Sequence, residues 1–340
     1  MPENADTYWL DFGQGVYSWT LQTYLRLKAD GFPCELTQTL PSEGIVLAHR
    51  GFLPFNLRPS SRLLIVCLKA DYEQHPYAQL HIVQNPAETK TIRDSYYMPH
   101  WSQPGLISRD EARGDQFENV AYFGLEKNIA TELQSPSWQE QLDVLGLRWY
   151  VVSRDRWHDY SNIDAIVAVR SFNSQDHTSK PATKLYNAWN AGVPAILGCE
   201  SAYIAERKSE LDYLEVASPN DAILALKRLR DHKKLRHAMI LNGKIRAEET
   251  NPKRLVNRWR NLLIDGVIPV YERWCKSSNL TKQIYWASRQ LEIKEKYLQP
   301  RYQNDFEYRE QETAGIQEQV IISMLQLYNK GKVKIKNILS

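Results

Sequence analysis

The chain has 340 residues, of which 43% are apolar and 24% charged, and its formal net charge is only +3. This length suits two domains with a core each, and the small net charge argues against nucleic acid as the main partner. No run of about 18 apolar residues is present to span a bilayer. Because the first ten residues also lack a signal-peptide pattern, we expect a cytoplasmic protein.

The spacing of potential metal ligands predicts a protein without metal or cofactor. The four cysteines show neither CxxC spacing nor histidine partners at zinc-ligand distances; they are Cys34, Cys67, Cys199 and Cys275. No Asp-x-Asp motif is present, so no pair of carboxylates is spaced to hold a divalent ion on a diphosphate. We therefore expect chemistry that is independent of metal ions.

The first third of the chain alternates predicted strands with helices. Residues 15–31 carry the periodicity of a helix that Gly31 ends. Short apolar runs predict strands over residues 44–48, 63–68 and 80–84. Because these runs are apolar on both faces, they indicate a parallel sheet covered by helices.

The same alternation starts again after a polar loop at residues 104–119. Further strands are expected over residues 119–124, 147–152, 164–170 and 193–198, with a helix over 137–146. Two such arrays predict an α/β fold with two Rossmann-like, doubly wound domains that face a cleft. The predicted domains are residues 1–112 on the acceptor side and 113–265 on the donor side.

The last part of the chain is expected to be a crossover and helical extension, residues 266–340. Helical patterns cover 218–249, 254–266, 281–297 and 316–328. Apolar residues at 316, 320, 324 and 327 form one stripe, and lysines 330, 332, 334 and 336 follow. Core packing or a homo-oligomer is favoured for this stripe, while peripheral contact with an anionic membrane is the alternative.

A candidate binding site follows the strand that ends near Arg170. In open α/β sheets ligands bind beyond the carboxyl ends of the strands, and here a polar loop leads from Arg170 to Lys180. The next helix is expected to begin near Pro181 to Thr183, with a serine or threonine as its cap. Its positive end would then face the ligand.

Lys180 and Lys184 are four residues apart, which places them on one face of this helix start. Together with Arg170 and Thr183 they are predicted to surround a diphosphate. Gly192 is expected to end the helix, so that the chain returns to the sheet. The alternative interpretation is that both lysines are ordinary solvated surface residues.

The stretch KPATKLYNAWNAGVPAILGCESAY, residues 180–203, resembles the donor-binding segment of GT-B glycosyltransferases, which use nucleotide sugars. The resemblance covers mainly residues 119–250. It implies transfer of a hexosyl-type sugar from a nucleotide-diphosphate donor, which is a co-substrate and not a cofactor, to a glycan or small-molecule acceptor. Retaining members of the largest such family carry two glutamates eight positions apart, where this chain has Ser179 and Asn187. Asn187 and Glu200 are therefore the candidates for binding the nucleotide ribose.

The first domain offers weaker candidates. Gly13 and Gly15 lie before the first helix, where GT-B proteins have a loop that faces the cleft. His49 directly follows a strand and is the candidate general base for an acceptor hydroxyl, because its unperturbed pKa lies near working pH. A loop histidine with a structural hydrogen bond is the alternative.

Other residues compete with His49 for the role of base. Asp71 and His100 are the rivals, and the adjacent His158 and Asp159 need not face each other. A retaining enzyme would need no such base.

A metal-independent glycosyltransferase is thus the favoured function. A nucleotide-sugar epimerase and a catalytically silent nucleotide-sugar-binding or scaffolding protein are the alternatives. A Rossmann dehydrogenase is disfavoured because no strand is followed by G-x-G-x-x-G.

Overall fold

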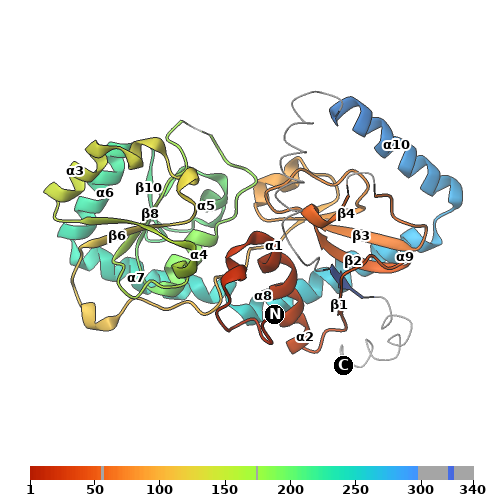
Figure 1. Cartoon of the computed structure of the whole chain (residues 1–340), viewed down its shortest axis with the longest axis horizontal. Helices are drawn as coiled ribbons and strands as arrows, with labels where there is room; N and C mark the ends of the chain where they lie inside the picture. Colours follow the sequence, from red (N-terminus) through yellow and green to blue (C-terminus); the bar gives the residue numbers. More distant parts are fainter. Residues whose placement is uncertain (55–56, 174, 298–320, 325–340) are drawn as a thin grey trace. The chain divides into compact units, whose positions relative to one another are not determined.

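The computed structural model describes residues 1–54, 57–173, 175–297 and 321–324 (Figure 1). These residues form two compact units, each built from separate stretches of the chain. Unit 1 contains Met1–Gly13, Asn85–Ala87 and Pro99–Leu255. Unit 2 contains Gln14–Gln84, Glu88–Met98 and the described residues from Val256 onward. The first thirteen residues therefore belong with the later half of the chain, and the carboxyl-terminal residues with the earlier half.

Unit 1 is built on a five-stranded parallel sheet. Its strands are β6 (Asn119–Phe123), β7 (Arg148–Val152), β8 (Ala165–Ala168), β9 (Ala195–Gly198) and β10 (Leu214–Val216). They lie in the order β10-β9-β8-β6-β7, and all neighbours are parallel. In this doubly wound order the direction of winding reverses between β6 and β8. Such a switch point is where open α/β sheets bind ligands.

Helices cover both faces of this sheet. They are α3 (Pro136–Val144), α4 (Thr183–Ala191), α5 (Ser201–Glu206), α6 (Pro219–Asp231) and α7 (Lys233–Ala247). Figure 1 shows α3 and α6 on one side of the strands and α4 and α5 on the other. The helix expected over 218–249 is divided in two because His232 leaves helical geometry, with φ −117° and ψ 78°. Ser218 caps α6 by accepting a hydrogen bond from the Asp221 N–H at 3.1 Å.

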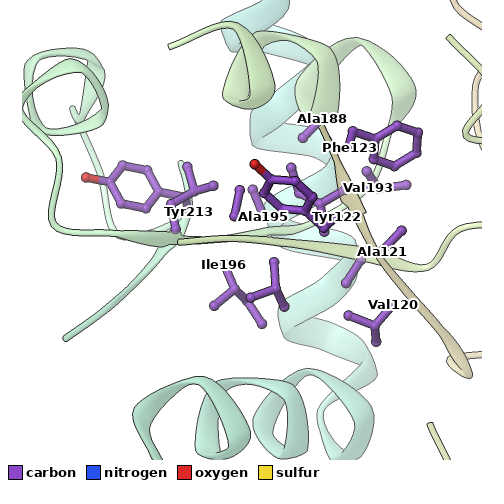
Figure 2. Close-up of a cluster of buried hydrophobic side chains, with 14 of the residues drawn as sticks. Val120, Ala121, Tyr122, Phe123, Ala188, Val193, Ala195, Ile196 and Tyr213 are labelled. Atoms are coloured by element: carbon purple, nitrogen blue, oxygen red, sulfur yellow. The ribbon is translucent and has the colours of Figure 1, made fainter. Parts of the chain in front are cut away.

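The core of unit 1 explains why its strands are recognisable in the sequence. Every residue of β6 and β9 is buried. Figure 2 shows Ala195 and Ile196 pointing to opposite faces of the sheet, with Tyr122 and Ala188 among the side chains packed on one of them. Since both faces are covered by helices, both sets of alternating side chains are apolar.

Unit 2 is built on a six-stranded mixed sheet. Its strands are β1 (Glu35–Thr37), β2 (Gly44–His49), β3 (Leu63–Leu68), β4 (Leu80–Val83), β5 (Ser95–Tyr97) and β11 (Ile321–Ser323). The order is β1-β11-β2-β3-β4-β5. Strands β2 to β5 are parallel, and β11 is antiparallel to both of its neighbours.

The helices of unit 2 come from both ends of the chain. An amino-terminal helical segment runs through α1 (Gly15–Tyr17), a π-helical turn (Ser18–Gln22) and α2 (Thr23–Ala29), and Gly31 follows at φ +76°. The carboxyl-terminal helices are α8 (Pro252–Asn261), which spans the boundary between the units, α9 (Ile268–Lys276) and α10 (Asn279–Tyr297). The expected α/β class with two Rossmann-like units and a helical carboxyl-terminal part is confirmed.

One expected helix is wrong. Residues 321–323, inside the helix expected over 316–328, form strand β11. Two consecutive β-branched isoleucines favour a strand, and both are buried between neighbouring strands. The apolar positions 316, 320 and 327 and lysines 330 to 336 lie outside the described residues, so the oligomer and membrane interpretations of this stripe stay predictions. Among the described helices, none combines the length and the apolar character that a membrane span requires.

Candidate functional site

A buried ion pair lies at the carboxyl edge of the unit 1 sheet. Arg170 stands two residues beyond the end of β8, and Glu200 stands two residues beyond the end of the neighbouring β9. The Arg170 guanidinium bonds to Glu200 Oε2, and the two side chains are only 11% and 4% exposed. The parallel pairing of β8 and β9 thus brings together two candidates that are thirty residues apart in sequence.

Two tyrosines complete the surroundings of this pair. The Tyr203 ring is fully buried, and burial raises the pKa of its hydroxyl, as does the charge of Glu200. Burial likewise raises the pKa of Tyr122, on β6, to about 12, with Arg170 and Glu200 acting on it as charges. Because Tyr122 is on β6 and Arg170 follows β8, these groups mark the switch point of the sheet.

Lys180 and Lys184 both lie near this cluster. The Lys184 ammonium is 5.3 Å from the centroid of the Tyr122 ring. Burial raises the pKa of Glu200, while the positive charges of Arg170, Lys184 and Lys180 oppose that rise. The structure therefore brings the three predicted cations around a single carboxylate, with a formal excess of two positive charges. Such an excess suits an anion that carries one charge on each of two phosphates.

The amino end of α4 adds further positive character. Ala182 is its N-cap residue, and no side chain caps the helix. The expected serine or threonine cap is wrong, because Thr183 is instead the first residue of the helix. Its hydroxyl is buried and has no hydrogen-bond partner among the residues described. The first amides of α4 thus keep the positive end of the helix dipole unneutralised by a cap.

Hydrogen bonds within the loop and to neighbouring segments hold the loop between β8 and α4 in place. The Ser171 hydroxyl is 3.1 Å from His177 Nε2, and His177 has a positive φ of 52°. Asp176 accepts a hydrogen bond from the Ser201 N–H at 2.7 Å, which joins the loop to the start of α5. Asn85 donates to the Ser201 hydroxyl at 2.9 Å and to the Lys180 carbonyl at 3.3 Å. These bonds position the backbone that carries Lys180.

The two candidates for ribose binding differ in their surroundings. Asn187 is 8% exposed and accepts a hydrogen bond from the Gln103 N–H at 2.9 Å. Glu200 is 3% exposed, and its Oε1 atom has no hydrogen-bond partner among the residues described. Glu200 therefore keeps an unused acceptor, whereas Asn187 Oδ1 already accepts a hydrogen bond from a backbone N–H.

His49 is at the carboxyl end of β2 in unit 2, as the sequence predicts, and it is only 3% exposed. Burial lowers its pKa to about 4, and nearby Asp71 opposes that fall. Nδ1 accepts a hydrogen bond from the Gly51 N–H at 3.2 Å, so His49 caps the short helix Arg50–Phe52. With Nδ1 as acceptor in the neutral ring, the proton is on Nε2, which is then a donor. This arrangement matches the structural alternative and leaves the role of base a prediction.

The weaker candidates for a base have distinct surroundings. Asp71 Oδ1 accepts a hydrogen bond from Gln84 at 2.6 Å. His100 Nδ1 is 2.8 Å from the Trp101 carbonyl and must donate to it. His158 stacks on Tyr8 with ring centroids 3.6 Å apart, whereas Asp159 pairs with Arg156 at 2.8 Å. His158 and Asp159 thus have separate partners.

The two amino-terminal glycines belong to different units. Gly13 is in unit 1, where a Cβ atom would come within 3.2 Å of the Trp157 ring. Gly15 begins α1 in unit 2, and a Cβ atom would meet nothing within 4 Å. Packing against Trp157 accounts for Gly13, and the predicted loop that faces a cleft stays a prediction.

Sequence reasoning missed several residues around the ion pair. They are Asn85, Tyr122, Gly124 and Tyr203. Gly124 follows β6 at φ +155°, and a Cβ atom there would come within 2.9 Å of the Tyr122 hydroxyl. A glycine directly after a strand was the one signal that could have pointed to this corner. Nothing in their sequence neighbourhood marks the tyrosines and Asn85.

Metal ligands do not gather in the part of the chain that the structure describes. No group of three or more histidine, cysteine, aspartate or glutamate side chains is arranged there to hold a metal ion. At the ion pair itself, Glu200 bonds to Arg170, and the charges of Lys184 and Lys180 also act on it. A site with this excess of positive charge attracts anions.

Comparison with known proteins gives likeness at the level of fold. No protein-family model matches the sequence, and no curated protein matches it. Among solved structures, a GtfA/B complex is 11% identical with a TM-score of 0.43, covering 60% of this chain and 53% of that one. A pneumococcal O-GlcNAc transferase, GtfA in complex with UDP and GlcNAc, is 10% identical with a TM-score of 0.42, covering 64% and 54%. Sucrose-phosphate synthase from Thermosynechococcus elongatus is 13% identical with a TM-score of 0.45, covering 76% and 80%. The chain spans about half the length of the first two, and these likenesses concern the fold alone.

Proposed function

We propose that this chain is a glycosyltransferase that takes a sugar from a nucleotide-diphosphate donor bound at the carboxyl edge of the unit 1 sheet. The observation that carries the proposal is the convergence of Arg170, Lys180 and Lys184 on the uncapped start of α4, beside the switch point. Lysines that pointed into solvent away from this edge of the sheet would not act on the buried carboxylate of Glu200, as both of these do. The resemblance of residues 180–203 to GT-B donor-binding segments supports the same ligand class.

Each group has a defined part in the proposed complex. Lys180, Lys184 and the first amides of α4 would bind the two phosphates. The Thr183 hydroxyl, buried beside those amides, would donate to a phosphate oxygen. Arg170 would contribute its charge while it stays paired with Glu200. As the bond to the sugar breaks, negative charge grows on the departing diphosphate, and these fixed cations stabilise it without a metal ion.

Glu200 gives the proposed site a means of recognising the nucleotide. Its buried Oε1 atom, without a partner among the described residues, is suited to accept a hydrogen bond from a ribose hydroxyl. Such a buried acceptor discriminates strongly between ligands. A ligand that lacks the ribose hydroxyl leaves the Glu200 oxygen without a hydrogen bond. We therefore propose Glu200, and not Asn187, as the residue that reads the ribose.

The test of the proposal starts from binding and release of nucleotides. UDP, GDP and ADP are titrated into the full chain by calorimetry, and nucleoside diphosphate release is measured with a panel of the corresponding sugars, with and without acceptors. For the base that binds, Lys184→Ala is expected to weaken binding by about 1.5–3 kcal/mol, which is the range for a hydrogen bond to a charged group. Lys244→Ala, an exposed lysine on α7 in the same unit, is the matched control and should bind normally.

The results separate the alternatives. Equal affinity of wild type and Lys184→Ala for the nucleotide would contradict the phosphate assignment. Tight binding without release of nucleoside diphosphate from any donor would favour the catalytically silent binder. Interconversion of two nucleotide sugars without an acceptor would favour the epimerase. Because the proposed site holds the diphosphate with cationic side chains and helix amides and needs no metal ion, turnover is expected to persist in EDTA.

A further inference from the structure

A cavity of about 870 Å³ lies at the amino-terminal edge of the unit 2 sheet. Leu80 and Ser95, which begin β4 and β5, are among the residues that line it, and all lining residues belong to unit 2. Its volume is within the range of about 300–1,000 Å³ that is typical of small-molecule sites. The cavity is separate from the proposed nucleotide site, which is at the carboxyl edge of the unit 1 sheet.

Hydrogen bonds hold the two helices that contribute to the lining of this cavity. The Trp274 indole on α9 donates to the Ser60 carbonyl at 3.3 Å. The Tyr285 hydroxyl on α10 donates to the Ala78 carbonyl at 3.1 Å. Trp274 and Tyr285 also pack edge to face, with ring centroids 5.3 Å apart. The cavity is therefore formed before a ligand binds, which lowers the entropy lost on binding.

Some of the charges at the cavity are balanced by α10. The Arg93 guanidinium, which lines the cavity, pairs with Glu292 at 2.6 Å. Asp94 also lines it, and its carboxylate lies 3.8 Å from the Arg289 guanidinium. These two pairs hold equal numbers of positive and negative charges, so they leave no excess.

Lys90 and Arg273 supply the charge that remains. Both line the cavity: Lys90 ends the short helix Pro86–Lys90 before β5, and Arg273 is on α9. Their side chains form no ion pair or hydrogen bond with the residues that the structure describes. An arginine can bind a carboxylate or a phosphate through two N–H groups, whereas a lysine acts as a point charge. Two unbalanced cations on different elements suit a ligand with two separate acidic groups.

Three hydroxyls that line the cavity already donate their proton to a backbone carbonyl. They are Thr91, Ser95 and Ser277, which donate to the carbonyls of Glu88, Ile92 and Trp274 at 3.2, 2.7 and 2.7 Å. A hydroxyl oxygen keeps its lone pairs as acceptors after its proton is used in this way. A ligand that fits the cavity therefore has O–H donors as well as negative charges.

We propose that this cavity binds an acidic carbohydrate, which is a sugar or sugar chain that carries carboxylate or phosphate groups. The acidic groups pair with Lys90 and Arg273, while the sugar hydroxyls donate to the three hydroxyl oxygens. A nucleotide also carries both kinds of group, but the Trp274 ring is only 9% exposed and offers no open face on which a base could stack.

The binding site itself goes beyond the proposed function and does not depend on it. Where the chain transfers sugars as proposed above, the site would hold a part of an acidic acceptor away from the reacting hydroxyl. This role alone rests on the proposed function.

Calorimetry with the full chain tests the ligand class. The probes are pentagalacturonate, which carries carboxylates, glucose 1,6-bisphosphate, which carries phosphates, and the neutral chain maltopentaose. We expect at least one acidic probe to bind one to one and at least about tenfold more tightly than maltopentaose, because only the acids can pair with the two cations. The acidic probe that binds more tightly identifies the acid that the natural ligand carries. Binding of neither acidic probe, or equal affinity for maltopentaose, would overturn the proposal.

A matched pair of variants tests the place of binding. The charge variant carries Lys90→Gln and Arg273→Gln, and the control carries Lys28→Gln and Lys244→Gln, at exposed lysines outside the cavity. The charge variant should bind the acidic probe at least about tenfold more weakly than the wild type, whereas the control loses the same charge and should bind it normally. In the wild type the probe should also slow hydrogen exchange of residues 89–96 and 270–285. Equal affinity of the charge variant and the wild type would place the ligand elsewhere and refute the site.

Titration with UDP separates this cavity from the proposed nucleotide site. The affinity for UDP is expected to be equal in the wild type and the charge variant, since neither substituted residue belongs to unit 1. A parallel loss of UDP binding and acidic-probe binding in the charge variant would mean that both ligands share one place, and the second site would be refuted. A wild type that binds the acidic probe but no nucleotide would contradict the proposed function and support this site.

Discussion

Arg170 and Glu200 form a buried pair in which each side chain balances the charge of the other. Burial alone would lower the pKa of Arg170, but its neighbours Tyr203 and Glu200 raise it above its ordinary value, so the guanidinium keeps its proton. Its charge is largely balanced by the carboxylate, and Lys180 and Lys184 supply the excess that an anion would feel. Removing one partner of such a buried pair lowers the stability of the protein, because the charge of the other partner is left uncompensated.

The variant Glu200→Gln tests whether Glu200 contributes to binding of the ribose or to binding of the phosphates. The amide keeps the shape of the carboxylate but removes its charge. We expect the affinity for the preferred nucleoside diphosphate to fall about tenfold or more, because the acceptor for the ribose hydroxyl is weakened. Affinity for inorganic pyrophosphate should stay equal or rise, because a negative charge beside it is gone. Both are measured by calorimetry, after a melting curve confirms that the variant is folded; a parallel loss for both ligands would mean that Glu200 acts only by holding Arg170.

At the scale of the element, α4 and β9 form the most predictable part of the molecule. The helix ends at Gly192, which has φ +68° and ψ 37° and serves as its left-handed C-cap. The chain then enters β9 and leads directly to Glu200. Because the helix start and the strand end belong to one short segment, its geometry positions both the lysines and the carboxylate.

Gly192→Ala tests the conformation of this turn. A Cβ atom would find its nearest neighbour, an Ile240 methyl group, at 3.9 Å, so the cost comes from the backbone and not from a clash. We expect a loss of about 1 kcal/mol in the free energy of unfolding, because alanine disfavours the left-handed region. Gly15→Ala is the control: it begins a helix in open space and should be neutral or slightly stabilising. Urea unfolding monitored by circular dichroism measures both, and equal stability of Gly192→Ala and wild type would contradict the expectation.

At the scale of the whole molecule, the two units differ in how they bury histidine. Unit 2 contains His49, His75 and His81, all nearly inaccessible. Burial lowers the pKa of His49 and His81 to about 4 and that of His75 to about 3, with Arg50 adding to the effect on His75. His75 donates through Nε2 to the Pro54 carbonyl at 2.9 Å, and His81 through Nε2 to the His75 carbonyl at 3.2 Å. These neutral rings are part of the structure of unit 2.

We therefore expect unit 2 to lose stability before unit 1 as the pH falls. An unfolded histidine takes up a proton as pH falls through about 6.5, whereas these three stay neutral in the folded state down to about pH 4 or below. Their contribution to stability is thus fully present above pH 6.5 and is lost as pH falls from about 6.5 to 4, at about 1.4 kcal/mol per pH unit for each ring. Urea unfolding at pH 7, 6 and 5, with limited proteolysis to identify the unit that opens, measures this slope. His81→Gln should remove about one third of it, and an unchanged slope would exclude a linked proton at that ring.

The sequence alone determined the elements that have continuous apolar runs or strong stop signals. Strands β2, β3, β6 and β9 are buried on both faces, so their composition is sufficient to identify them, and Gly31 and Gly192 mark helix ends that only positive φ explains. It also identified Arg170, Lys180, Lys184 and Glu200 as candidates that the fold then brings together.

The partner of each of these groups depends on contacts between segments that are distant in the sequence. Three short strands were missed, namely β1, β5 and β10, and β11 was expected to be helical, because three-residue strands are stabilised by distant neighbours and not by local pattern. For the same reason the pairing of Arg170 with Glu200, the hydrogen bond between Asn187 and the Gln103 N–H and the burial of His49 could not be read from spacing. Local propensity acts over a few residues, whereas these hydrogen bonds, charges and desolvation arise between segments that meet only in the folded sheets.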